Sequence, residues 1–156
     1  MKSDAEWLEL AIDLATANVA DGGGPFGAVL VKDGAQLATG QNRVTRDVDP
    51  TAHAEVVAIR AACAQLGDFA LTGAVLYASC EPCPMCMATS LWARVDRIVY
   101  AADRDDAARG GFDDREFYEL FAQPRSTWGT AVEQLPVDAG TVPFDTWLAH
   151  PDRTAY

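Results

Sequence analysis

Two short motifs carry side chains that can bind a metal ion and move protons. His53 is followed two positions later by Glu55, and Cys83 and Cys86 lie well downstream. Imidazole and thiolate are the donors that tetrahedral Zn²⁺ prefers, and three protein ligands leave the fourth position open for water. An open zinc site lowers the pKa of its bound water from about 15.7 to about 7. We therefore predict a hydrolytic zinc site with ligands His53, Cys83 and Cys86, and with Glu55 as the catalytic proton carrier.

Two other uses of these residues stay open. The two downstream cysteines alone have the spacing of a redox pair, but that use leaves His53 and Glu55 without a role. Cys80 could complete a four-ligand structural zinc site with no room for water. However, Cys80 is predicted at a strand end, away from the helix face that Cys83 and Cys86 share. This position disfavours the four-ligand site. A zinc module without catalytic activity is nevertheless kept as the competing hypothesis.

The elements that carry the two motifs are predicted to be helices. The range 51–65 has a helical pattern, with His53 and Glu55 in its first turn, and the range 84–93 begins beside the cysteines. The positive end of a helix dipole favours thiolate over thiol. Residues two apart in a helix point in different directions, so Glu55 cannot easily join His53 as a ligand. This leaves Glu55 available for acid–base work.

The remaining segments alternate between helices and strands. A capping box at Ser3 and Glu6 opens an amphipathic helix, which the glycines at 22–24 are expected to end. Strands are predicted at 26–31, 36–42, 75–78, 97–102 and 130–134, and helical segments at 113–121 and 144–149. The first two strands form a hairpin and the later ones alternate with helices. We therefore expect an α/β sandwich around a mixed five-stranded sheet.

Composition and charge narrow the range of partners. The chain has 156 residues, which predicts a single domain over 1–156, and 49% of them are hydrophobic, as in soluble globular proteins. The net charge is −11, with 23 acidic against 12 basic residues. Proteins that bind nucleic acid use Lys and Arg to neutralise phosphates. We expect a small-molecule substrate and no nucleic-acid partner.

Three further features predict a cytoplasmic protein. No apolar run approaches the roughly 20 residues that a membrane helix needs, so no membrane partner is expected. The first residues lack the apolar stretch of a signal peptide. Three of the four cysteines are crowded together, unlike those of a secreted disulfide framework.

At these residues the chain resembles the zinc-dependent cytidine deaminase-like superfamily, whose motif joins His-x-Glu to Pro-Cys-x-x-Cys. Further similarity to its bacterial guanine deaminases covers 23–29, Asn42, 49–55, 79–86, 92–94 and 111–114, and continues to Phe144, Trp147 and Tyr156. The resemblance implies a cytidine deaminase-like three-layer α/β/α sandwich with one catalytic zinc per subunit. It also implies a zinc-dependent aminohydrolase of a cyclic amidine, converting guanine to xanthine and ammonia in purine catabolism.

The resemblance also implies roles for residues outside the zinc motif. The attack would fall on C2 of guanine, and Glu55 would protonate N3. The residues expected to contact the base are Phe26, Asn42, Ala54, Trp92, Asp114 and Tyr156. From residue types alone, Asn42 also suits a turn cap, and Phe26 and Trp92 also suit a core. Asp113 competes with Asp114, and either could cap the next helix.

The sequence leaves several substrates possible and supports the mode of assembly only through the resemblance. Cytosine, cytidine, guanosine and an aminotriazine such as ammeline remain alternative substrates. Some guanine deaminases are thought to use an additional C-terminal glutamate, where this chain offers only Asp145. The resemblance implies a homodimer, and it suggests that the segment from about 125 to 156 is swapped so that Tyr156 closes the partner's site.

Overall fold

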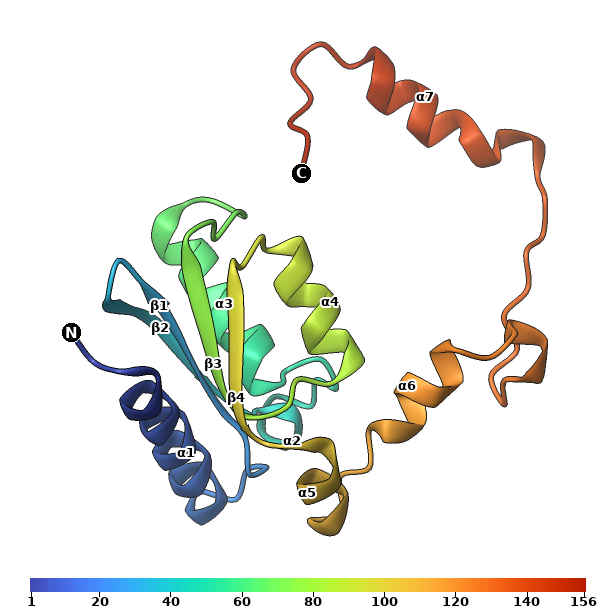
Figure 1. Cartoon of the computed structure of the whole chain (residues 1–156). Helices are drawn as coiled ribbons and strands as arrows, with labels where there is room; N and C mark the ends of the chain where they lie inside the picture. Colours follow the sequence, from blue (N-terminus) through green and yellow to red (C-terminus); the bar gives the residue numbers. More distant parts are fainter. The chain divides into compact units, whose positions relative to one another are not determined.

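The computed structural model describes all 156 residues, which divide into two compact units, Met1–Tyr118 and Glu119–Tyr156 (Figure 1). The strands are β1 (Gly27–Lys32), β2 (Ala35–Gln41), β3 (Ala74–Cys80) and β4 (Arg97–Ala102). The helices that begin in the first unit are α1 (Asp4–Ala20), α2 (Val44–Asp47), α3 (Ala54–Leu66), α4 (Pro84–Trp92), α5 (Arg104–Arg109) and α6 (Arg115–Phe121).

The sheet of the first unit is mixed, as predicted, in the order β2-β1-β3-β4. The β1–β2 hairpin and the β1–β3 pair are antiparallel, whereas β3 and β4 are parallel. Because of these directions, the start of β1 and the ends of the other three strands share one edge of the sheet. The chain segments that leave this edge meet there, and they include both zinc-binding motifs.

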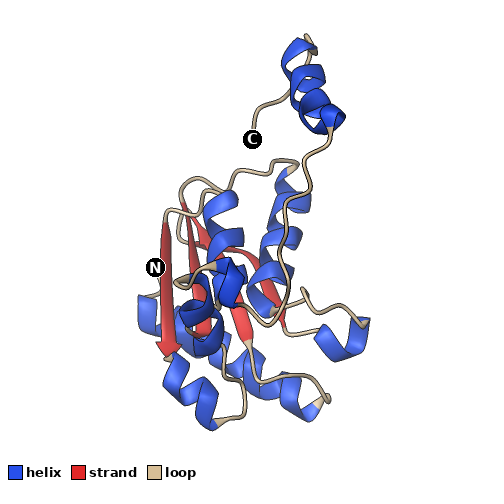
Figure 2. Ribbon diagram, turned by 90° about the vertical axis from the view of Figure 1, so that its right-hand side faces the viewer, coloured by secondary structure: helices blue, strands red, loops and turns tan.

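Helices cover both faces of the sheet, which confirms the predicted three-layer α/β/α sandwich. Figure 1 shows α1 on one side and α3 and α4 on the other, and Figure 2 shows the same layering from the side. Along β1, Val29 and Val31 pack with Trp7 of α1, while Leu30 joins the core beneath α3. Alternating side chains of one strand thus fill two separate cores.

Two glycines in the sheet allow the helices to lie directly on it. A Cβ at Gly27 would lie 2.3 Å from the carbonyl oxygen of Ala11 in α1. A Cβ at Gly40 would lie 2.0 Å from the carbonyl oxygen of Ala54, in the first turn of α3. Any larger residue would push these helices away from the sheet. Gly40 therefore sets how closely the start of α3 approaches β2.

Local signals explain most of the observed boundaries. The capping box of Ser3 and Glu6 is formed at the start of α1. α3 ends at Leu66 and is followed by Gly67, whose φ of +66° is unstrained for glycine. The short α5 was not predicted, although Asp103 and Asp106 form a capping box at its start. That box is the signal that would have revealed it.

The predicted fifth strand at 130–134 is wrong, and the sheet has four strands. This stretch has no regular structure, and its one large apolar side chain, Val132, is exposed. A strand needs a partner strand and a face to bury, and this segment has neither within its own unit. Helix α7 (Val142–Ala149) confirms the helical turn predicted at 144–149.

The second unit has no core of its own. Besides α7 and the end of α6, it contains two 3₁₀ turns, η1 (Arg125–Thr127) and η2 (Asp138–Thr141). Every residue of α7 is exposed, including Phe144, Trp147 and Leu148. In neither unit is any helix long and apolar enough to span a membrane.

Candidate active site

His53 and Cys83 occupy equivalent positions at the starts of two helices. Each is the N-cap residue, with φ/ψ of −68°/156° at His53 and −66°/168° at Cys83. The helix predicted from 51 begins three residues later, at Ala54, whereas the helix predicted from 84 begins at Pro84 as expected. Neither side chain makes a capping hydrogen bond, so the imidazole and the thiol are available for a ligand.

The donor atoms of the three predicted ligands have the spacing that zinc requires. Nδ1 of His53 lies 3.6 Å from Sγ of Cys83 and 3.5 Å from Sγ of Cys86. All three donor atoms lie within 4.8 Å of one another. Tetrahedral zinc with ordinary bond lengths separates a sulfur and a nitrogen ligand by about 3.6 Å. The residues present therefore fit zinc, as the donor chemistry predicted.

The two cysteine thiols differ in protonation. A hydrogen bond from Cys86 and a second one from His53 lower the pKa of Cys83 to about 4. The pKa of Cys86 is raised, because its proton is held in the bond to Cys83 and its thiol is buried. Cys83 is thus a thiolate in this arrangement, and metal binding would release the proton of Cys86.

Glu55 is a buried carboxylate beside the ligands but outside the group of three that can hold the metal. Its side chain is only 7% exposed, and its Oε2 lies 3.4 Å from Sγ of Cys86. Burial raises the pKa of Glu55 above its usual range. A raised pKa brings a carboxyl group closer to the pH at which it can both take up and release a proton.

These side chains form one side of a cavity of about 520 Å³, a size typical of small-molecule sites. We call this side the metal wall, made of His53, Glu55 and Cys83. Other lining residues, which we call the loop wall, come from chain segments outside the regular elements: Gly24, Phe26, Asn42, Phe112 and Asp114. The cavity thus combines the possible metal ligands with aromatic, amide and carboxylate side chains.

Aromatic and amide groups of the loop wall come from three separate loops. Phe26 and Phe112 pack edge to face, with ring centroids 5.0 Å apart. Asn42 is 8% exposed, and its backbone N–H donates to the carbonyl oxygen of Phe26 at 3.1 Å. The Asn42 side chain also accepts from the N–H of Val44 at 3.3 Å. Asn42 thus caps a turn while lining the cavity.

The two adjacent aspartates of the loop wall have different surroundings. Both carboxylate oxygens of Asp113 accept hydrogen bonds from Arg115, at 2.8 Å each. Oδ1 of Asp114 is buried and has no hydrogen-bond partner. Burial raises the pKa of Asp114, and the negative charge of Cys83 adds to the effect. A buried acceptor without a partner is costly, so Asp114 points to a ligand that donates a hydrogen bond.

Other residues singled out in the sequence lie elsewhere. Ala54 is fully buried in the core and does not line the cavity, so its contact with the base stays a prediction. Trp92 ends α4 outside the cavity lining, with Arg94 over its ring at 5.7 Å. Tyr156 belongs to the second unit, where its ring contacts Trp147 edge to face. Contacts of Trp92 and Tyr156 with the base stay predictions.

Cys80 is at the end of β3, as predicted, and also lines the cavity. Its Sγ donates to the carbonyl oxygen of Asp103 at 3.6 Å, and burial raises its pKa to about 11. It is not one of the three residues grouped around the metal position. A protonated Cys80 outside that group argues against the closed four-ligand site.

Comparison with known proteins places this geometry in a family. The family model for the cytidine and deoxycytidylate deaminase zinc-binding region matches residues 1–102. Guanine deaminase of Bacillus subtilis (strain 168) is 46% identical over 151 residues, covering 96% of this chain and 97% of the relative. A tRNA-specific adenosine deaminase of Agrobacterium fabrum is 43% identical over 102 residues, covering 65% of this chain and 67% of the relative.

Solved structures agree with the sequence relatives. The crystal structure of guanine deaminase from Bacillus subtilis matches with a TM-score of 0.97 and 45% identity, over 99% of both chains. A structure of a second protein, in complex with 2,6-diaminopurine, matches with a TM-score of 0.70 and 34% identity, over 73% of this chain and 64% of the other. The chain therefore belongs to the zinc-binding cytidine and deoxycytidylate deaminase family and, within it, groups with bacterial guanine deaminase.

Proposed function

We propose that this protein hydrolyses guanine to xanthine and ammonia. The observation that carries the proposal is the extent of similarity to guanine deaminase, which includes nearly the whole chain. The tRNA-specific adenosine deaminase aligns with about two thirds of it. The net charge of −11 also disfavours a polyanionic substrate such as tRNA. A free base is therefore the better substrate.

The metal wall supplies the groups that the hydrolysis needs. Zinc bound by His53, Cys83 and Cys86 would lower the pKa of a water molecule and so provide the nucleophile near neutral pH. Glu55 takes a proton from the water that adds to C2 and delivers it to N3 of the ring. A second proton passes through the same carboxylate to the amino group, the C2–N bond breaks, and ammonia leaves.

The loop wall holds the purine in place. Asp114 accepts a hydrogen bond from a ring N–H or the amino group, which satisfies its unpartnered Oδ1. The amide of Asn42 bonds the other polar edge of the base, and Phe26 packs against the ring face. The structural relative that binds 2,6-diaminopurine supports this, because that purine also carries an amino group at C2.

A panel of amino bases tests the proposal. Purified zinc-loaded protein is incubated with guanine, guanosine, cytosine, cytidine, adenine and ammeline, and ammonia release is followed. Guanine should be turned over fastest. Turnover of another base with guanine untouched would overturn the substrate and keep the deaminase. Full zinc content with no turnover of any base would instead support a structural zinc module.

We also propose a homodimer in which residues from about 125 to 156 are exchanged between subunits. Phe144 and Leu148 of α7 are 69% and 64% exposed, and the second unit has no core to bury them. An amphipathic segment without a core needs another surface to be stable. A partner subunit of the same sequence supplies one, and Tyr156 would then close the partner's site.

Co-expression of two inactive chains tests the exchange. One chain carries Glu55→Gln with an intact C-terminal segment, and the other keeps Glu55 but lacks 125–156. In an exchanged dimer the second chain regains a complete site, so mixed dimers should be active. Mixed dimers as inactive as either parent dimer would contradict the exchange.

We further propose that the protein is cytoplasmic. In that compartment its four free cysteines would stay reduced.

A further inference from the structure

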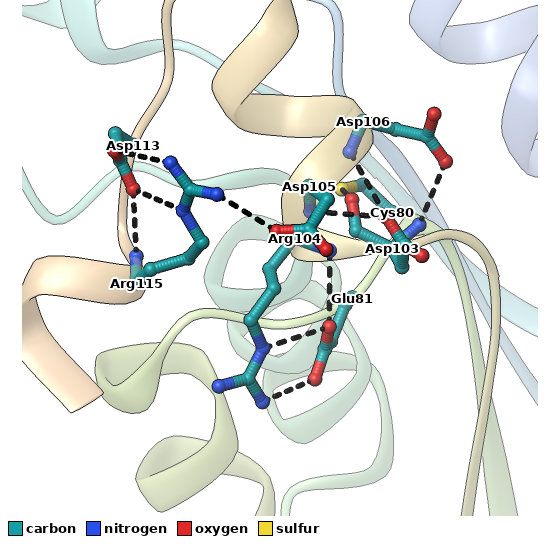
Figure 3. A network of polar contacts seen from close by, with 8 residues as sticks. All are labelled: Cys80, Glu81, Asp103, Arg104, Asp105, Asp106, Asp113 and Arg115. Carbon is teal, nitrogen blue, oxygen red and sulfur yellow. Dashed lines mark hydrogen bonds and ion pairs between the residues drawn. The ribbon is translucent and has the colours of Figure 1, made fainter. Parts of the chain in front are cut away.

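A network of ion pairs borders the cavity and takes no part in the chemistry proposed above (Figure 3). One of its ion pairs joins Arg104, at the start of α5, to Glu81. The guanidinium donates from Nε to Oε2 of Glu81 at 3.1 Å and from Nη2 to Oε1 at 2.5 Å. The backbone N–H of Arg104 donates to Oε2 as well, at 3.0 Å. Such two-pronged pairs fix both groups in direction as well as distance.

The carboxylate that Arg104 binds belongs to a rigid part of the molecule. The Glu81 side chain is 11% exposed, and its backbone N–H donates to the carbonyl oxygen of Ala102 at 2.8 Å. Glu81 continues directly from β3, and the next residue, Pro82, is fully buried. This segment leads into Cys83 of the metal wall. Arg104 is therefore anchored to the part of the site that the sheet supports.

On its other side Arg104 contacts the helix that follows Asp114. The guanidinium carbon lies 4.0 Å from the centre of the Tyr118 ring in α6. The Tyr118 hydroxyl donates to the carbonyl oxygen of Pro82 at 2.6 Å. Asp114 is joined to the same turn of α6, because its carbonyl oxygen accepts from the N–H of Phe117 at 3.1 Å. The first turn of α6 is thus tied to the segment before Cys83.

We propose that Arg104 is a positioning residue for deamination, holding Asp114 at the correct place beside the metal wall. The inference rests on the proposed function, because it assigns Asp114 to the substrate. Oδ1 of Asp114 has no hydrogen-bond partner, so the position of this atom depends on the contacts that hold the surrounding segment. A shift of about 1 Å in a substrate-holding group can lower a rate by about 100-fold. Lysine cannot replace the planar fork and its stacking on Tyr118.

Steady-state kinetics of Arg104→Ala test the proposal. We expect kcat/KM for guanine to fall by about 10- to 100-fold with zinc content unchanged. Arg104→Lys should recover only a small part of the loss. Arg109→Ala is the matched control, since Arg109 is on the same helix, is exposed and pairs only with Asp106. Assays run well below the melting temperature of each variant separate the effect from unfolding.

A double-mutant cycle asks whether Arg104 acts through Asp114. In an Asp114→Asn background, Arg104→Ala should lower kcat/KM by less than about 3-fold, because the group it positions is already lost. Equal losses in both backgrounds would show that Arg104 does not act on Asp114. Unchanged kcat/KM of Arg104→Ala with a lowered melting temperature would reduce it to a stabilising residue.

Two further measurements keep this inference separate from the identity of the substrate. If the protein turns over another amino base and not guanine, the same variants are compared on that base. Guanine binding by zinc-loaded Glu55→Gln protein, measured by calorimetry, needs no turnover. There Arg104→Ala should weaken binding by about 10-fold, and unchanged affinity together with unchanged kcat/KM would overturn the positioning role.

Discussion

The metal wall and the loop wall of the cavity differ in what holds their side chains in place. On the metal wall, Glu55 is buried on a helix that lies against the sheet at Gly40. On the loop wall, Phe112 is 44% exposed and Asp114 lies between two short helices. Packing of the core holds the side chains of the metal wall in position. The side chains of the loop wall depend on a few polar contacts between loops. Substitutions should therefore act on chemistry at one wall and on substrate binding at the other.

The largest effect is expected from removal of a ligand on the metal wall. Cys83→Ala should lose bound zinc and, with it, all measurable deamination, because two remaining ligands hold the ion poorly. Zinc is measured by metal analysis of the purified protein and activity by ammonia release. Cys63→Ala is the control, because Cys63 is a free cysteine on α3 outside the cavity. Retained zinc in Cys83→Ala would show that the ligand set is wrong.

A substitution of Glu55, the predicted proton carrier of the metal wall, should lower the rate of deamination without loss of bound zinc. Glu55→Gln should lower kcat by about 10²- to 10⁴-fold while zinc and fold persist. The amide keeps the shape of the side chain but cannot transfer protons in the same way. Glu9→Gln, at an exposed position of α1, should leave kcat unchanged. Full activity of Glu55→Gln would contradict the assigned mechanism.

A loop-wall substitution should act mainly on how the substrate is held. Asp114→Asn should lower kcat/KM for guanine by about 10- to 150-fold, since a hydrogen bond to a charged group contributes about 1.5–3 kcal/mol. Asp113→Asn should cost less, because Arg115 already binds that carboxylate. Both are measured by steady-state kinetics at equal zinc content. The reverse order of losses would assign the substrate to Asp113.

The smallest expected effect is on stability, and it tests whether the core places the metal wall. Gly40→Ala should lower the free energy of unfolding by about 1–3 kcal/mol, since its Cβ would overlap the carbonyl oxygen of Ala54. Urea denaturation followed by circular dichroism measures the change. At Gly129 an added Cβ meets nothing within 4 Å, so Gly129→Ala should be neutral. Equal stability of the two variants would mean that α3 is free to shift.

Much of the metal wall was predictable because its information is local. Spacing within two short segments predicted the donors, and the predicted helix starts were correct at Pro84 and three residues early at Ala54. The loop wall was harder to predict. From residue types alone, Asn42 suited both a turn and a ligand role, and the structure shows it in contact with a turn and with the cavity. Nothing in the sequence pattern marked Phe112 or Glu81 as a residue of the site, because neither residue type is unusual in a loop.

The sequence by itself predicted the three donors that the structure brings together, the glutamate beside them, the mixed sheet and the α/β layering. Each of these follows from residue chemistry and from periodicity over a few turns. Tertiary structure alone decided that Asp114 rather than Asp113 has the unpartnered oxygen, and that Arg104 joins the segments before Cys83 and after Asp114. It also showed that the 130–134 segment has no strand to pair with. These outcomes depend on contacts between segments far apart in the chain, which local spacing does not encode.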